Sequence, residues 1–126
     1  RLNAHGELIN EMHLHNIVLI CNKYRRTHFA LWSKRKDIVK KYFDNNKKPT
    51  NLILVYSNPK INNIIDENNI PKYFNKTFNN VSHNKFIDKQ NCTGQQCKDC
   101  VLCYEFNNIN TIVEAVKING RLDKNI

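Results

Sequence analysis

The sequence predicts an α/β protein in which repeated βα units form part of a parallel sheet or of a partial β/α barrel, with a cysteine-rich loop toward the C-terminus. Three observations predict this class. Short apolar segments of strand composition alternate with segments whose apolar residues recur at helical spacing. Residues 52–55 form an uninterrupted apolar run, which is typical of a parallel strand buried on both faces. Four of the five cysteines fall between Cys92 and Cys103.

The predicted elements alternate along the chain up to residue 82. They are, in order, a strand at 1–4, a helix at 9–24, a strand at 28–32, a helix at 37–46, a strand at 51–56, a short helix at 61–65 and a strand at 77–82. The last stretch, 109–118, fits either a helix or a strand. Residues 1–90 are expected to form the βα region. Residues 91–126 are expected to hold the cysteine loop and the terminal element of the same domain.

The first predicted helix carries an apolar stripe near the 3.6-residue period. Its expected buried members are Ile9, Met12, Ile17, Ile20, Cys21 and Tyr24. Free cysteine is among the residue types most often buried. We therefore expect Cys21 to lie in the core and outside any metal site.

The other cysteines, Cys92, Cys97, Cys100 and Cys103, have the spacing C-x4-C-x2-C-x2-C. Soft thiolates at short spacing suit zinc or iron-sulfur centres better than calcium or magnesium. Structural zinc sites usually hold two cysteine pairs on either side of a long insert, which is absent here. Consecutive x2 spacings are similar to the ferredoxin run, whose cysteines bind different irons. An iron-sulfur cluster, of the [4Fe-4S] type, is therefore favoured, and zinc is the alternative.

Residues near the cysteines are candidates for modifying such a site. Lys98 is expected to offset thiolate charge, and Tyr104 and Phe106 to exclude water. The alternative is a solvated lysine and two core aromatics. His83 is a candidate substitute ligand.

The composition limits the expected partners. The formal charge is +9, but 22 Asn, 15 Lys and 14 Ile indicate a compositional bias, so the charge alone assigns no function. Because nucleic-acid readers rely on arginine and this chain has 15 Lys to 5 Arg, nucleic-acid binding is possible but not indicated. No apolar run approaches the ~18 residues of a membrane helix, so no membrane partner is expected. The total of five cysteines is odd and four of them are too close together to join distant parts of a secreted fold, which favours a reducing cytoplasm.

Polar residues follow three predicted strands, at His5-Gly6-Glu7, Ser33-Lys34 and Ser57-Asn58. Because the carboxyl ends of parallel strands meet at one edge of a sheet, these residues and the cysteine loop are expected to line one pocket. The candidate catalytic residues are His5, Glu7 and Lys34, and the candidate cofactor-binding residues are Gly6, Ser33, Ser57 and Asn58. Glu7 would hold a ribose hydroxyl or amino group, Lys34 a carboxylate or phosphate, and His5 would transfer a proton. The alternative is that they are ordinary turn residues.

Both ends of the chain resemble the phage and plasmid gene product 88 family. The segment Arg1-Leu2-Asn3-Ala4-His5-Gly6-Glu7-Leu8 is similar to that family's strand and R-x-x-x-S-G-D-F motif, with His5 replacing serine and Glu7 replacing aspartate. The ending Cys97-Lys98-Asp99-Cys100-Val101-Leu102-Cys103-Tyr104 resembles its C-x-x-C...C-W/Y tail. Trp32-Ser33-Lys34 and Val55-Tyr56-Ser57 stand where the family has aromatic-T/S-K and F-S-x motifs.

The resemblance implies a radical-SAM-like protein of phage or mobile-element origin, with a partial β/α barrel and a C-terminal cysteine cluster. It implies that this chain is the C-terminal portion, without the family's N-terminal cysteine motif, that the full-length protein binds S-adenosylmethionine, and that residues 109–118 form a strand. We therefore expect an iron-sulfur-binding domain, and whether it is itself an enzyme stays open. The alternative is a zinc-stabilised, non-enzymatic module that binds nucleic acid or a partner protein.

Overall fold

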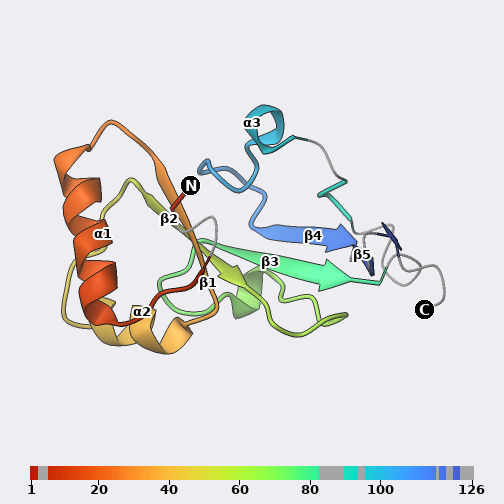
Figure 1. The fold of residues 1–126 in the computed structure, drawn as a ribbon, viewed down its shortest axis with the longest axis horizontal. Helices are drawn as coiled ribbons and strands as arrows, with labels where there is room; N and C mark the ends of the chain where they lie inside the picture. The colour runs from red at the N-terminus through yellow and green to blue at the C-terminus, as the bar shows by residue number, and fades with distance from the viewer. Residues whose placement is uncertain (3–5, 83–89, 94–95, 116, 119–120, 123–126) are drawn as a thin grey trace.

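The computed structural model of the protein describes residues 1–2, 6–82, 90–93, 96–115, 117–118 and 121–122. Its centre is a four-stranded sheet in the order β1-β2-β3-β4, in which every neighbouring pair is parallel (Figure 1). The strands are β1 (Phe29–Ser33), β2 (Leu52–Ser57), β3 (Lys76–Val81) and β4 (Thr111–Ala115). This parallel sheet and the helices that accompany it confirm the predicted α/β class.

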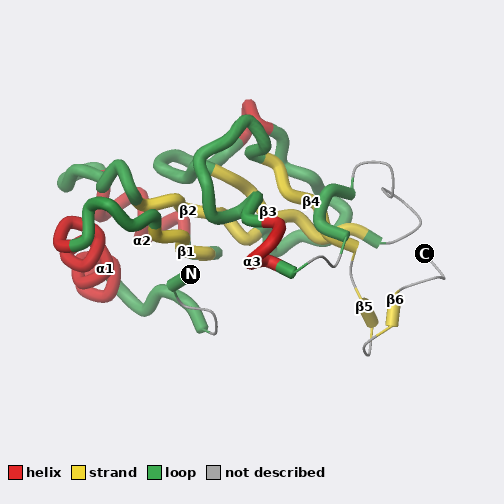
Figure 2. Tube along the Cα trace, turned by 90° about the horizontal axis from the view of Figure 1, so that it is seen from above, coloured by secondary structure: helices red, strands yellow, loops and turns green. Residues whose placement is uncertain are grey.

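Helices of different length flank the sheet. They are α1 (Glu11–Lys23), α2 (Lys36–Phe43), the short 3₁₀ helix η1 (Glu67–Asn69) and α3 (Cys97–Cys100). Both α1 and α2 lie together beside β1 and β2, whereas α3 lies on the side of β3 and β4 (Figure 1, Figure 2). A small antiparallel pair, β5 (Lys117–Ile118) and β6 (Arg121–Leu122), follows β4. None of the helices in these described ranges has the length and apolar character that crossing a membrane requires.

Short parallel bridges extend the sheet at both edges. Leu2 pairs with Leu31 next to β1, and its backbone N–H donates to the Ala30 carbonyl at 2.8 Å. Cys92 pairs with Glu114 next to β4. The expected strand at 1–4 is therefore represented by a bridge at Leu2, while residues 3–5 lie outside the described part. The first clustered cysteine is fixed to the opposite edge.

The main core lies between the sheet and the helices α1 and α2. In α1, the buried side chains are Leu14, Ile17, Val18 and Cys21, which follow the i, i+3, i+4, i+7 pattern of one helix face. They pack with α2 and with the residues of β1 and β2 that point to the same side. Burying each such side chain contributes about 1.5–3 kcal/mol, so this layer is the main apolar source of stability.

The predicted stripe of α1 is correct for Ile17 and Cys21 and wrong for its other members. Ile9, Met12, Ile20 and Tyr24 are all exposed. The reason is that α1 carries apolar residues on two sides, and the face containing Leu14 and Val18 is the one that meets the sheet. Cys21 is completely buried, as expected.

The predicted helix at 61–65 is also wrong, because side chains of neighbouring elements bind the backbone of this segment. The Asn79 Oδ1 atom accepts a hydrogen bond from the Ile65 N–H at 3.1 Å, and the Asn58 amide donates to the Asn63 carbonyl. The Asn62 N–H donates to the Asn80 carbonyl at 2.9 Å. These bonds fix a turn and an extended stretch, and only η1 is helical before Pro71. The strand alternative for 109–118 is correct for β4 and β5.

Candidate functional site

The four clustered cysteines line one cavity of about 350 Å³, which we call the thiol cavity. It lies on the face of the sheet opposite to α1 and α2, because its strand residues alternate with those of the main core. The strands contribute Trp32, Ser57, Phe78, Asn80, Ile112 and Glu114 to its lining. Arg1, next to one edge, and Cys92, at the other edge, line it too. Residues from both edges of the sheet therefore line this one cavity.

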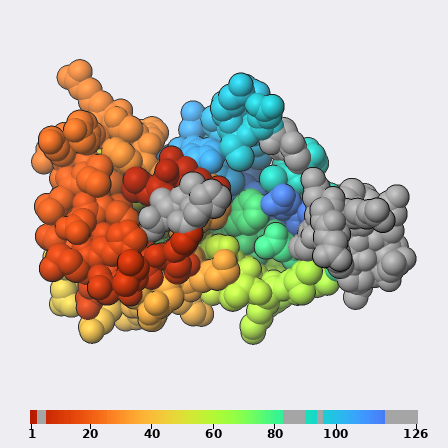
Figure 3. Space-filling model, viewed as in Figure 1, coloured from red at the N-terminus to blue at the C-terminus, as the bar shows by residue number. Residues whose placement is uncertain are grey.

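The cysteines lie in residues 92–104, here called the cysteine segment, of which 94 and 95 are not described. A single helical turn, α3, begins at Cys97 and ends at Cys100, and Val101 follows with a positive φ of 50°. Cys97 is exposed, and the other three are half-buried. All five cysteines of the chain lie in described residues, and none forms a disulfide. The cysteine segment lies beside the N-terminal residues on one face of the molecule (Figure 3).

Cys103 lines the thiol cavity together with the other three thiols, and its surroundings shift its pKa. Burial raises the pKa of Cys103 to about 12, the neighbouring Cys92, Cys100 and Cys97 raise it as well, and the Lys76 ammonium opposes them. Without further positive charge, the protonated thiol is therefore the stable form of Cys103. A metal centre would supply that charge and deprotonate it.

The donor set and its arrangement can be compared with the expected metal groups. Four thiols suit zinc or an iron-sulfur cluster chemically. Among the residues that the structure describes, however, no three Cys, His, Asp or Glu side chains are placed to hold a single metal ion. The four thiols do line one cavity. His83, the candidate substitute ligand, lies outside the described residues.

The polar residues predicted at the strand ends form a hydrogen-bonded group. The Glu7 carboxylate accepts from the Ser33 hydroxyl at 2.6 Å and from the Lys34 N–H at 2.7 Å. The Lys34 Nζ atom in turn donates to the Ser57 Oγ atom at 3.3 Å. The structure thus brings Glu7, Ser33, Lys34 and Ser57 together at the carboxyl ends of β1 and β2. Of these four, Ser57 also lines the thiol cavity.

The remaining predicted site residues are placed differently. Asn58 is buried, and its amide donates to the Asn63 carbonyl and, at 3.0 Å, to the Asn79 Oδ1 atom, so both of its N–H groups hold the fold. Gly6 is exposed with a φ of +93°, a conformation that favours glycine. His5 lies outside the described residues.

The sequence did not point to Arg1 and Trp32, which line the thiol cavity, or to Lys76, which lies on the same face of the sheet outside that lining. The Arg1 guanidinium lies 3.9 Å from the centre of the Trp32 ring, and Trp32 packs edge-on against Tyr104 at 5.3 Å. Lys76, on β3, is 1% exposed. The alternation of side chains along a strand could have indicated Lys76 in the sequence, because residues two and four positions apart, here Phe78 and Asn80, point to the same face of the sheet.

One expectation about the residues near the cysteines, that Phe106 excludes water at the site, does not match the structure, and the exposure of Lys98 fits the alternative of a solvated lysine. Phe106 is 49% exposed and packs against the His28 ring rather than lining the thiol cavity. Lys98 is exposed to solvent. Tyr104 does line the cavity, as predicted.

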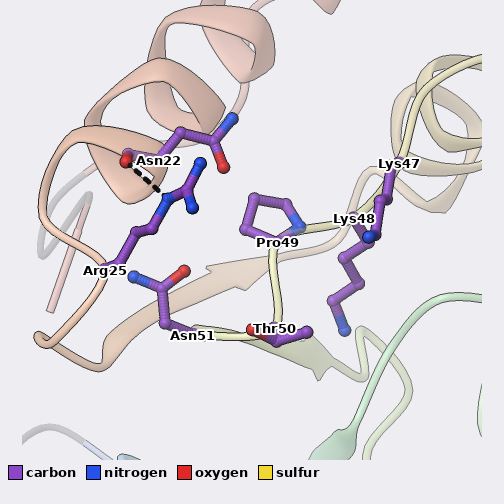
Figure 4. Close-up of a pocket in the computed structure, with 7 residues that line it drawn as sticks. All are labelled: Asn22, Arg25, Lys47, Lys48, Pro49, Thr50 and Asn51. Atoms are coloured by element: carbon purple, nitrogen blue, oxygen red, sulfur yellow. Dashed lines mark hydrogen bonds between the residues drawn. The ribbon is translucent and has the colours of Figure 1, made fainter.

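A second cavity, also of about 350 Å³, lies at the opposite end of the strands, where β2 begins. We call it the basic cavity, because Arg25, Lys47 and Lys48 line it and no carboxylate does. Asn22 and Arg25 lie on one side of Pro49 and the two lysines on the other (Figure 4). An adjoining hollow adds Lys23 and Arg26. These cations therefore surround one end of the sheet.

Comparisons with known proteins give no family for this chain. No family model, curated protein or solved structure matches it. The class that can be stated is an α/β protein built on a four-stranded parallel sheet.

Proposed function

We propose that this chain binds a metal centre, an iron-sulfur cluster, through Cys92, Cys97, Cys100 and Cys103. The observation that carries the proposal is that these four thiols line one cavity on the sheet. Short spacing in sequence brings three of them together, but Cys92 reaches the cavity by a separate contact with the edge of β4. Chance clustering in sequence would not require that convergence.

The arrangement supports a cluster over a single zinc ion. In a cubane, each cysteine binds a different iron, so the four sulfurs stand around a group wider than one ion. Zinc requires its four ligands to meet at one point, about 2.3 Å from each sulfur. The four thiols line one cavity, and no three of the described Cys, His, Asp or Glu side chains are placed to hold a single ion. When bound, such a cluster would bind substrate or transfer electrons.

The frame around the cavity supports the resemblance to the gene product 88 family. The strands β1 to β4 follow each other in sequence order, each neighbouring pair is parallel, and residues from both edges of the sheet line the thiol cavity. We propose that this is part of a β/α barrel built from repeated βα units, with the cysteine segment as the C-terminal loop of the same domain. In that setting S-adenosylmethionine, a radical-SAM-like activity and a phage or mobile-element origin belong to the full-length protein, in a reducing cytoplasm.

Different residues at the carboxyl ends of the strands would then bind the metal, exclude water and contact a substrate. The thiolates hold the metal, while Trp32 and Tyr104 exclude water beside it. The Glu7 carboxylate accepts from the Ser33 hydroxyl and the Lys34 N–H, and the Lys34 ammonium donates to the Ser57 hydroxyl. The carboxylate and the ammonium would provide an acidic and a basic contact for a substrate next to the cavity.

Substitution of single cysteines tests which thiols are ligands. We expect Cys100→Ser and Cys103→Ser to reduce iron and sulfide content sharply after anaerobic reconstitution of the chain. Cys21→Ser is the matched control, because Cys21 is buried in the other layer of the core and should leave the content unchanged. Equal content in all four proteins, the wild type included, would show that iron is bound elsewhere.

A second candidate function, binding of nucleic acid by a zinc-stabilised module, is favoured by the basic cavity. Arg25 and Lys47 line it, and Lys23 and Arg26 extend the positive surface; none of the four forms an ion pair within the described residues. Phosphate groups bind such surfaces by releasing counterions, so affinity falls steeply with salt.

The test of this candidate is fluorescence anisotropy of a single-stranded DNA oligonucleotide over a series of salt concentrations. The double variant Arg25→Gln/Lys47→Gln should weaken binding and reduce the salt slope by up to about two. The control, Lys60→Gln/Lys98→Gln, removes the same charge from other places and should have a smaller effect. Absence of binding by the wild type at low salt would remove this candidate.

A further inference from the structure

Lys76 is a buried cation without a described anionic partner. Its residue is 1% exposed, and it makes no ion pair with any carboxylate in the part of the chain that the structure describes. Burial lowers its pKa, and the charge of Cys103 acts in the opposite direction. Removing an ammonium group from water is costly unless an opposite charge or several hydrogen bonds compensate. Some interaction must therefore offset the free-energy cost of burying the Lys76 ammonium.

Neutral acceptors supply part of that compensation. The Lys76 Nζ atom donates to the Asn107 Oδ1 atom at 2.8 Å and to the Ile109 carbonyl at 2.6 Å. Both acceptors lie just after the cysteine segment. An ammonium has three N–H groups, and the hydrogen bonds among the described residues account for two of them.

Lys76 lies on the same face of the sheet as the thiol cavity, next to the described residues that line it. It is the residue of β3 that pairs with Val55, which belongs to the apolar cluster on the cavity face. Two and four positions further along β3, Phe78 and Asn80 line the cavity itself. Asn107, which accepts a hydrogen bond from the Lys76 Nζ atom, donates to the carbonyl of Leu102 at 3.4 Å, directly before Cys103.

We propose that Lys76 is the buried counter-charge of a net-anionic metal-thiolate group held in the thiol cavity. This inference rests on the proposed function and adds a residue outside the cysteine segment to it. Four thiolates around a +2 centre leave a formal charge of about −2. A cation in the low-dielectric core beside that group stabilises it, whereas a charge in water is screened.

The other cations near the cavity do not replace Lys76 in this role. Lys98 is next to Cys97 in sequence but exposed, and Arg1 is exposed and stacked on the Trp32 ring. Lys76 acts through the cysteines, as a positioning residue, and touches no substrate in this account.

The test compares Lys76→Met with Lys76→Arg, which keeps the charge, and with the control Lys98→Met. Lys76→Gln keeps a hydrogen-bond donor while removing the charge, so it remains informative if the methionine variant does not fold. All are made in the full chain, their folding is checked by circular dichroism, and they are reconstituted anaerobically with iron and sulfide. The midpoint potential of the cluster is then measured, together with Zn²⁺ affinity by chelator competition.

Loss of the Lys76 charge should lower the midpoint potential, because a nearby cation favours the more negative, reduced cluster. It should also weaken Zn²⁺ binding by at least about tenfold, whereas Lys76→Arg and Lys98→Met stay near the wild type. Folded Lys76→Met and Lys76→Gln proteins that match Lys98→Met in both quantities would overturn the inference. A wild type that binds zinc but no cluster would contradict the iron-sulfur proposal alone, because the Zn²⁺ affinities of the variants would still test the role of Lys76. A wild type that binds neither would overturn both.

Discussion

At the scale of single residues, two side chains from the connection between α2 and β2 stabilise the amino-terminal ends of the strands. Asn51 is buried, and its amide donates to the carbonyls of Cys21, Tyr24 and Thr27 at 3.0, 3.1 and 2.9 Å. It satisfies carbonyls that the end of α1 would otherwise leave without partners. Lys48 carries its ammonium inward, to the Tyr73 carbonyl at 2.8 Å and to the Asn75 side chain.

Replacing Asn51 with alanine should destabilise the protein by about 2–3 kcal/mol, because buried carbonyls lose their donor. Urea unfolding followed by circular dichroism measures the change. Asn45→Ala is the control, since Asn45 is exposed and the described hydrogen bond of its side chain, to the Lys41 carbonyl, is long at 3.4 Å. Equal losses in the two variants would mean that Asn51 does not cap α1.

Lys48 should make stability depend on pH above neutrality. Burial lowers the pKa of Lys48 from 10.5 to about 8. Between these two values the unfolded chain holds the proton and the folded chain releases it, so raising the pH favours folding. The cost of burying the charge, up to about 3 kcal/mol at lower pH, is removed across this window.

The measurement is the difference in unfolding free energy between the wild type and Lys48→Met, near neutral pH and at about pH 10. The wild type should gain on the variant as the pH rises. Comparing the two proteins removes the contribution of thiols such as Cys21, whose pKa burial raises to about 11 and which acts in the opposite direction. A difference that does not change with pH would contradict the burial of this ammonium.

At the scale of elements, Glu7 joins the segment before α1 to the end of β1 and the start of α2. One carboxylate oxygen accepts from the Leu8 N–H at 2.7 Å and from the Ser33 hydroxyl, and the other accepts from the Lys34 N–H. The Ser33 hydroxyl also accepts from the Arg35 N–H at 2.9 Å, where α2 begins. A single carboxylate thus organises the connections at the carboxyl end of β1.

Glu7→Ala should lower the unfolding free energy by about 2–3 kcal/mol, because the N–H groups of Leu8 and Lys34 and the Ser33 hydroxyl lose a charged acceptor. Glu7→Gln should lose less, since its amide oxygen still accepts on one side. Glu67→Ala, on the exposed η1, should change stability by less than about 0.5 kcal/mol in the same denaturation assay. If Glu7→Ala behaved like this control, the proposed junction would be wrong.

How far the sequence predicts these elements depends on whether local pattern or tertiary contact decides them. The strands β1 and β2 were predictable, because uninterrupted apolar runs have few alternatives in an α/β protein. The segment 61–65 was not, since the Asn58 and Asn79 side chains that fix its backbone come from other elements. In α1, apolar residues lie on two sides of the helix, so the sequence alone does not predict which side packs against the sheet.

The candidate site was predictable to a different extent. Cysteine spacing alone identified the thiols, and the strand-end rule brought Glu7, Ser33, Lys34 and Ser57 together. Neither of these rules points to Lys76, because its proposed role depends on its burial and on its hydrogen bonds to Asn107 and Ile109 rather than on a motif. Asn58 fits a site motif in sequence but is used inside the fold.

At the scale of the whole molecule, metal binding and folding should be coupled. The cysteine segment joins the last strand of the sheet to the rest of the chain, and Cys92 is fixed to the edge of β4 by a bond from its N–H to the Val113 carbonyl at 2.9 Å. Binding free energy at such a site is gained only in the folded state. Cys100→Ala should therefore lose metal and lower the melting temperature together; unchanged melting would mean that the segment is peripheral to the fold.

The identity of the metal tests the central claim most directly. The chain is produced in medium that contains both iron and zinc, purified without oxygen, and examined by visible absorption, metal analysis and acid-labile sulfide analysis. The account predicts a brown protein with broad visible absorption and about four irons and four sulfides per chain. A colourless protein that carries one zinc per chain and no sulfide would contradict it.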